Sequence, residues 1–168
     1  HWTQNRCALS RRLWRALEPQ QEIYMGILSD FVIANSNEAK DIGVSLRPAD
    51  SWQTLEGWKG IETIKLSTLF CSITGEQYTN DLQKSFPLVG GNRDEGPWVF
   101  EFPEKILSCF SEISNSDIPS IAKKWVTTEE LEMDGWSCSD AEMFIGQISE
   151  YAKIAETESK QLFLWLSL

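Results

Sequence analysis

The chain has 168 residues, of which 42% are apolar and 24% are charged, and its formal net charge is −10 at pH 7. This length and composition are typical of one globular domain and exclude a disordered or fibrous protein. The acidic charge would repel phosphate groups, so we expect no nucleic-acid partner. No run of apolar residues approaches the about 20 that a membrane-spanning helix needs, so we expect no integral membrane segment.

The first 24 residues differ in charge from the rest of the chain. They carry four arginines and two glutamates, whereas residues 25–168 carry eleven basic and twenty-three acidic side chains. Met25-Gly26 is typical of a protein start, so we interpret residues 1–24 as an upstream extension outside the core. A basic amphipathic segment is the alternative, because four apolar residues share one helical face: Leu9, Leu13, Trp14 and Leu17. Residues 25–168 are then a single globular domain.

The first predicted element is a strand at residues 27–34 (ILSDFVIA), which is rich in β-branched and aromatic residues. Ser36 or Asn37 would then cap a short helix that ends at Gly43. Residues 44–60 contain one proline and two interior glycines with two tryptophans between them. This pattern predicts a long loop that the indoles attach to the core.

Three helices and one short strand follow. Residues 61–74 carry an apolar stripe at helical spacing, and Gly75 is a typical helix end. Residues 85–97 (SFPLVGGNRDEGP) predict a loop, and residues 98–102 (WVFEF) predict a strand. Helices are expected from Pro103 to Ile113 and again from Pro119, because proline favours the first helical turn.

The last two predicted elements define the fold. Ser139 begins a capping-box pattern followed by an apolar stripe, which predicts a long helix to about Ser159. Residues 162–168 (LFLWLSL) place apolar side chains on both faces of a strand, which is typical of a strand covered on both sides. We expect this strand to pair with the one after Met25. The predicted fold is therefore α+β, a mostly helical single domain with a small sheet.

The order of these elements resembles that of the YfbM-like bacterial proteins. The resemblance rests on Met25-Gly26 before a short strand, the string Ser72-Ile73-Thr74-Gly75 at a helix end, acidic residues before the last long helix, and an apolar final strand. It extends over most of residues 25–168 and implies a small α+β cytosolic protein. The family has no known function, so the resemblance implies no catalytic residues.

Residue types exclude several kinds of catalytic site. The only histidine is His1, so residues 25–168 cannot form a Ser-His-Asp or Cys-His site of their own. The four cysteines stand about thirty or more residues apart, which fits no zinc site. Cys71 and Cys109 lie within helical patterns, which favours buried reduced thiols and a cytoplasmic location. We expect no cofactor, although an enzyme that uses carboxylates stays an alternative.

Two groups of residues are candidates for a site. Acidic residues near the last helix, Glu129, Glu130, Glu132 and Asp134, could supply oxygen ligands for a hard cation. We expect a solvated acidic surface there and no metal, because the ligand spacing of a calcium-binding loop is absent. The candidate residues for binding a ligand or partner combine cations, carboxylates and indoles: Arg47, Trp52, Trp58, Arg93, Asp94, Glu95 and Trp98.

Three functions remain open. The first is a non-enzymatic protein-interaction module, such as an immunity-type protein, that holds a basic protein partner with its acidic surface and a tryptophan-supported loop. The second is a small-molecule-binding protein or enzyme that uses carboxylates in a pocket lined by tryptophan and arginine. The third is a structural subunit that forms a homo-oligomer through an apolar patch near residues 162–168.

Overall fold

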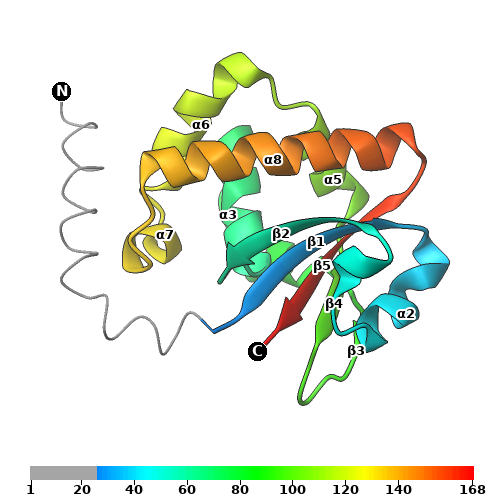
Figure 1. Ribbon diagram of the computed structural model, residues 1–168. Helices are drawn as coiled ribbons and strands as arrows, with labels where there is room; N and C mark the ends of the chain where they lie inside the picture. Colours follow the sequence, from blue (N-terminus) through cyan, green and yellow to red (C-terminus); the bar gives the residue numbers. More distant parts are fainter. Residues whose placement is uncertain (1–25) are drawn as a thin grey trace.

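The computed structural model describes residues 26–168, so the interpretations of residues 1–24 and of Met25 lie outside the described residues. Five strands form one antiparallel sheet with the order β2-β1-β5-β4-β3. Seven α-helices accompany the sheet within the described residues (Figure 1). The predicted α+β fold is confirmed.

Strands β1 (Leu28–Ala34) and β5 (Gln161–Ser167) form the centre of the sheet. They pair over their full length, from Leu28 opposite Ser167 to Ala34 opposite Gln161. Both strands bury side chains on both faces, because helices cover the sheet on both sides. The expected pairing of the strand after Met25 with the C-terminal strand is confirmed.

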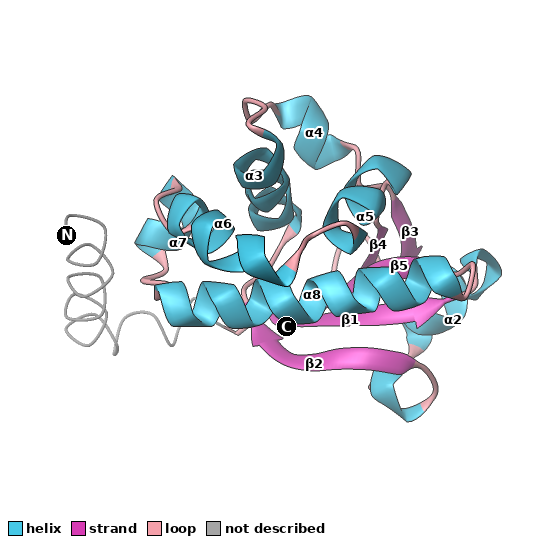
Figure 2. Cartoon of the chain, turned by 90° about the horizontal axis from the view of Figure 1, so that it is seen from above, coloured by secondary structure: helices cyan, strands magenta, loops and turns pink. Residues whose placement is uncertain are grey.

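The two faces of the sheet are covered unequally. Four helices pack on one face around the larger core: α3 (Thr63–Thr74), α5 (Glu104–Ser111), α6 (Ile118–Trp125) and α8 (Cys138–Thr157). The opposite face carries the short helix α2 (Ala39–Val44) over a smaller core (Figure 1). Figure 2 shows α8 running along β1, with β2 and β3 at opposite edges of the sheet. Helices α4 (Asn80–Lys84) and α7 (Glu129–Met133) are short.

The loop expected at residues 44–60 is wrong, because its second half is an edge strand. A 3-10 turn at Pro48–Asp50 precedes β2 (Gln53–Lys59), which pairs antiparallel with β1. The register shifts between Ser29 and Phe31 of β1, so Leu55 and Trp58 both pack into the larger core although they are three residues apart. A β-bulge of this kind breaks the period of two by which a strand is recognised in sequence.

The loop expected at residues 85–97 also contains a strand, β3 (Leu88–Gly91), which pairs with β4 (Trp98–Glu101). Its glycines allow α2 to lie directly on the strand. A Cβ atom at Gly90 would overlap the carbonyl oxygen of Ala39, and one at Gly43 would overlap the backbone nitrogen of Gly91. These glycines therefore mark a close approach of two backbones. The expectation that Gly43 ends the helix is wrong, because α2 continues to Val44.

This close approach predicts opposite effects of two glycine-to-alanine changes in helices. Gly146→Ala in α8 is expected to raise the free energy of unfolding by about 0.5–1 kcal/mol, because the new methyl group would meet only Ile118 Cδ1, at 3.8 Å. Gly43→Ala is expected to lower it by about 1–3 kcal/mol, because the backbone of β3 must move. Urea denaturation followed by circular dichroism measures both values, and a stabilising Gly43→Ala would contradict the close packing of α2.

The side of α3 opposite its apolar stripe carries polar residues, and these are buried. Lys65 is 3% exposed and Thr68 is 5% exposed. The indole Nε1 of Trp125 in α6 donates to Lys65 O at 3.2 Å and to Thr68 Oγ1 at 3.1 Å. The ammonium group of Lys65 contacts the carboxylate of Asp134 and donates to the carbonyl oxygen of Gly60. Because these polar groups have partners, α6 and α7 can cover this side.

Most remaining predicted boundaries agree closely with the structure, although the expected cap is wrong, because Asn35 and not Ser36 or Asn37 caps the 3-10 turn before α2. Helix α3 ends at Gly75, whose φ of 78° is left-handed. The long helix α8 begins two residues earlier than predicted, because Ser137 and not Ser139 accepts the backbone N–H of Asp140. Among residues 26–168, no helix combines the length and apolar character that a membrane span requires.

Candidate functional site

Arg47 is held by carboxylates at the β2 edge of the sheet. Its Nε donates to Glu56 Oε1 at 3.1 Å, and its NH2 group donates to Glu56 Oε2 at 3.3 Å. Asp50 accepts a third hydrogen bond from NH1, at 3.2 Å. This two-point contact with Glu56 neutralises the guanidinium group, which is therefore unsuited to recruit an anionic ligand.

The two tryptophans expected beside Arg47 lie on opposite faces of the sheet. Trp52 packs against the smaller core under α2, whereas Trp58 packs into the larger core. There Trp58 stacks on Trp136 with ring centroids 5.6 Å apart, and its Nε1 donates to Gln147 at 2.8 Å. Arg93 follows β3, at the edge opposite β2. The structure therefore does not bring Arg47, Trp52, Trp58 and Arg93 together into one pocket.

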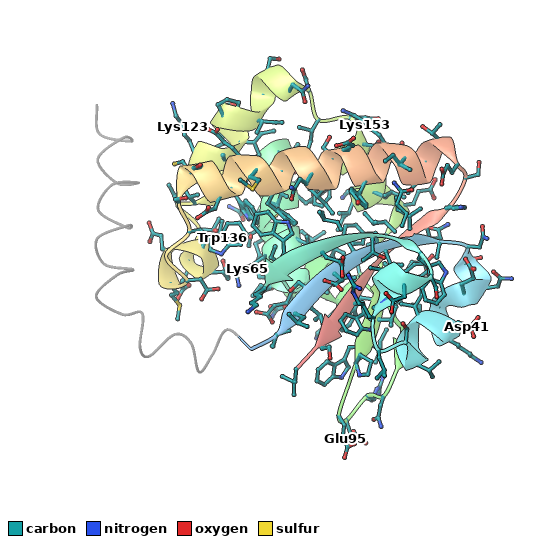
Figure 3. The ribbon with its side chains drawn as sticks, in the orientation of Figure 1. Asp41, Lys65, Glu95, Lys123, Trp136 and Lys153 are labelled. Atoms are coloured by element: carbon teal, nitrogen blue, oxygen red, sulfur yellow. The ribbon has the colours of Figure 1, made fainter. Side chains whose placement is uncertain are left out.

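The loop between β3 and β4 holds Asp94 and Glu95, and Trp98 is the first residue of β4. Trp98 donates its Nε1 hydrogen to Arg93 O at 2.8 Å, so one indole fixes the middle of the loop. Asn92 Oδ1 accepts the backbone N–H of Asp94 at 3.0 Å, and the N–H of Gly96 donates to Asn92 O at 2.8 Å. Glu95 extends from the tip of this loop (Figure 3). The loop is therefore internally bonded and presents Arg93, Asp94 and Glu95 to solvent.

The acidic run before α8 forms the short helix α7. Glu129 and Glu132 are exposed, while Asp134 contacts the ammonium group of the buried Lys65. Within residues 26–168, no three histidine, cysteine or acidic side chains converge as ligands of a metal would. Asp134 therefore serves the packing of α7 on α3 by neutralising a buried charge.

Asp30 is a polar residue that the sequence reasoning missed as a candidate. It is 7% exposed in β1 and lies opposite Trp165 in the β1–β5 ladder. Burial, with a smaller contribution from the negative charge of Glu56, raises the pKa of Asp30 to about 6 against the opposing effect of Arg47. The available signal was a single acidic residue inside the otherwise apolar string ILSDFVIA. A carboxyl group with this pKa exchanges protons near neutral pH.

A groove of about 680 Å³ lies between α2 and the β3–β4 hairpin. We call it the β3 groove. Helix α2 contributes Lys40, Gly43 and Val44, and the hairpin contributes the four residues of β3 and part of the loop that includes Arg93 and Pro97. Val44 is 82% exposed although it is apolar. The β3 groove therefore combines strand backbone, an exposed apolar side chain and two cations.

A second groove, of about 660 Å³, lies between α3, α5 and α6 and contains the half-buried Cys109. Its walls carry both signs of charge, because Lys105 pairs with Glu76 at 3.3 Å while Glu112 and Lys124 lie nearby. Burial, with a smaller contribution from the negative charges of Glu112 and Glu76, raises the pKa of the Cys109 thiol to about 11. A thiol with this pKa is almost entirely protonated at neutral pH, so it is a poor nucleophile.

The apolar C-terminal strand offers little surface for self-association. Leu162 and Leu164 are fully buried, and Leu166 is 8% exposed, because β5 lies between β1 and β4. Only Leu168, at 79% exposed, leaves the sheet. The patch that the homo-oligomer hypothesis requires near residues 162–168 is therefore covered by the protein itself.

No family model, curated protein or solved structure matches this chain. The resemblance to YfbM-like proteins therefore stays a prediction.

Proposed function

We propose that the protein is a non-enzymatic protein-interaction module that binds an extended segment of a partner protein along β3. The observation that carries the proposal is the edge position of β3, which pairs only with β4 among the described strands. An edge strand offers unpaired backbone N–H and C=O groups, and an extended peptide can add to them as a further strand.

The two edges of the sheet differ in how they are protected. Strand β2 carries exposed Gln53, Glu56 and Lys59, and charged side chains on an edge discourage strand addition. Strand β3 (LVGG) has no charged residue. A register shift between Leu88 and Gly90 interrupts the regular ladder, which limits the pairing geometry available to an added strand.

The surroundings of β3 supply what a bound strand needs besides backbone pairing. Val44 and Pro97 border the β3 groove and can pack against an apolar side chain of the partner. The loop that carries Arg93 is already ordered by Trp98 and Asn92, so binding would cost little loop entropy. The lining contains no acidic residue, cysteine or tyrosine, and this set of groups suits binding better than catalysis.

Asp30 favours the second candidate function, a small-molecule-binding protein or enzyme that uses a carboxylate. Its raised pKa is the property that a general acid or base needs. Neither the β3 groove nor the groove that contains Cys109 is lined by Asp30, however. Asp30 therefore supports this function less directly than the exposed edge supports strand addition. A cytoplasmic location is part of the interaction-module proposal.

The proposal predicts that random ten-residue peptides displayed on phage and selected on the full chain will bind at β3. Selected peptides are expected to slow hydrogen exchange of the backbone amides of residues 88–91. Val44→Ser is expected to weaken their binding about tenfold, because it removes an apolar contact in the β3 groove. Leu46→Ser is the matched control, because Leu46 is 97% exposed and does not line the groove.

Two results would contradict strand addition. The first is selected peptides that bind without protecting residues 88–91. The second is equal loss of binding in Val44→Ser and Leu46→Ser, which would place the contact outside the β3 groove.

A further inference from the structure

We infer that the partner segment is acidic and that one of its carboxylates binds to Lys40 and Arg93 in the β3 groove. This inference rests on the proposed strand addition and names the chemistry of the segment. The net charge of the chain predicts the opposite, a basic partner. The charges that line the β3 groove favour an acidic partner over a basic one.

Lys40 and Arg93 are the only charged residues that line the β3 groove. They come from two different elements, because Lys40 lies in α2 and Arg93 lies in the loop after β3. No carboxylate lines the groove, although residues 25–168 contain twenty-three acidic and eleven basic side chains. A cationic groove on a strongly acidic protein would attract an acidic segment and repel a basic one.

The two cations are not neutralised by the protein itself. In the described part of the chain, neither Lys40 nor Arg93 forms an ion pair. Arg47 differs, because Glu56 and Asp50 occupy its guanidinium group. Both Lys40 and Arg93 are exposed, so their side chains can reach a bound carboxylate.

The carboxylates nearest in sequence do not cancel this charge within the groove. Asp41, Asp94 and Glu95 are exposed and are absent from the groove lining. The backbone N–H groups of Asp94 and Glu95 donate to Asn92 Oδ1, at 3.0 Å and 3.4 Å. This Asx turn fixes the backbone of the loop tip beyond Arg93.

An extended segment can satisfy both kinds of contact in the β3 groove. Successive side chains of a strand point to opposite sides, so acidic residues can alternate with β-branched ones. The acidic side chains, which share one face of the added strand, would then meet Lys40 and Arg93, while its backbone pairs with β3. Because the ion pairs are exposed, they should weaken as salt screens them, while the backbone pairing should not.

Two synthetic peptides test the inference on the full chain. One has the sequence TEVEVEVET and the other TKVKVKVKT, so they share length and valine positions and carry charges of opposite sign. We expect the glutamate peptide to bind at least about tenfold more tightly by calorimetry, to protect residues 88–91 from hydrogen exchange, and to lose most of this preference at about 0.5 M salt.

Charge reversal in the β3 groove supplies the decisive comparison. The double variant Lys40→Glu/Arg93→Glu is expected to reverse the preference in favour of the lysine peptide. The control Lys59→Glu/Lys123→Glu changes the net charge equally but alters β2 and α6, outside the groove lining, and should keep the original preference. Lys123 lies on α6, far from Glu95 in Figure 3.

The outcomes separate this inference from the proposed function. Equal binding of both peptides, with protection of residues 88–91, would keep strand addition and overturn the acidic partner. Tighter binding of the lysine peptide would also overturn it and would restore the basic partner predicted from net charge. Binding of neither peptide would overturn both proposals.

Discussion

Replacing Trp125 with alanine is expected to lower the free energy of unfolding by about 3–5 kcal/mol, a large share of the about 5–15 kcal/mol typical of one domain. Trp125 is fully buried, and its ring centroid lies 5.3 Å from that of Trp136 and 5.6 Å from that of Phe144. Loss of the indole would leave a cavity between α3, α6 and α8. It would also remove the hydrogen bonds to Lys65 O and Thr68 Oγ1.

Urea denaturation followed by far-ultraviolet circular dichroism would measure this loss without relying on tryptophan fluorescence. Trp125→Phe is the informative companion variant, because it keeps an aromatic ring but cannot donate the two hydrogen bonds. An intermediate loss is expected for it. If the free energy of unfolding of Trp125→Ala lay within about 1 kcal/mol of the wild-type value, Trp125 would not be the packing centre of α3, α6 and α8.

Asp30→Asn is expected to stabilise the protein near neutral pH by up to about 3 kcal/mol. Burial and the charge of Glu56 raise the pKa of Asp30 from 3.8 to about 6, so folding at pH 7 forces an ionised carboxylate into an unfavourable site. Asparagine is similar in shape and carries no charge.

The pH dependence follows from the direction of the shift. Because the pKa is higher in the folded protein, the folded state binds more protons between about pH 3.8 and pH 6. The free energy of unfolding of the wild type should therefore fall as pH rises through this window. Above the window, the full cost of ionising Asp30 in the folded protein remains. The advantage of Asp30→Asn should shrink from about 3 kcal/mol at pH 7.5 to about 1 kcal/mol at pH 4.5.

Asp50→Asn is the control for this prediction. It removes an exposed carboxylate that forms an ion pair with Arg47, whose charge also acts on Asp30. Exposed ion pairs contribute about 1 kcal/mol or less. A pH-independent difference between Asp30→Asn and wild type would show that the carboxyl group of Asp30 ionises normally. The expected pH-dependent stabilisation by Asp30→Asn would show that the Asp30 carboxylate lowers the stability of the wild type, which is typical of functional positions.

The parts of the fold that were predictable are those where one local pattern was sufficient. Residues 162–168 contain apolar side chains for both faces, and this pattern correctly predicted a central strand that pairs with β1. The apolar stripe before Gly75 correctly predicted α3. The two edge strands were missed for different reasons. The bulge in β2 hides its alternation, and the glycines of β3 resemble those of a loop but allow contact with α2.

The candidate site was predictable only in part. Arg93, Asp94, Glu95 and Trp98 were candidates, and they lie together in or beside the loop between β3 and β4, where Trp98 donates to Arg93 O. The grouping of Arg93 with Arg47 does not agree with the structure, because the order of strands places their elements at opposite edges of the sheet. Neither Lys40 nor Val44 showed a distinctive sequence pattern, since their role depends on α2 lying beside β3.

Composition and local periodicity by themselves determined the acidic character, the absence of histidine from residues 25–168, the main helices and the central strand pair. These properties depend on residue type and on neighbours within a few positions, which the sequence shows directly. Only the tertiary structure decided that Lys65 is buried, that Asp30 has a raised pKa and that the β3 groove is cationic. Burial, pKa and local charge depend on elements distant in sequence, and their packing brings those elements together.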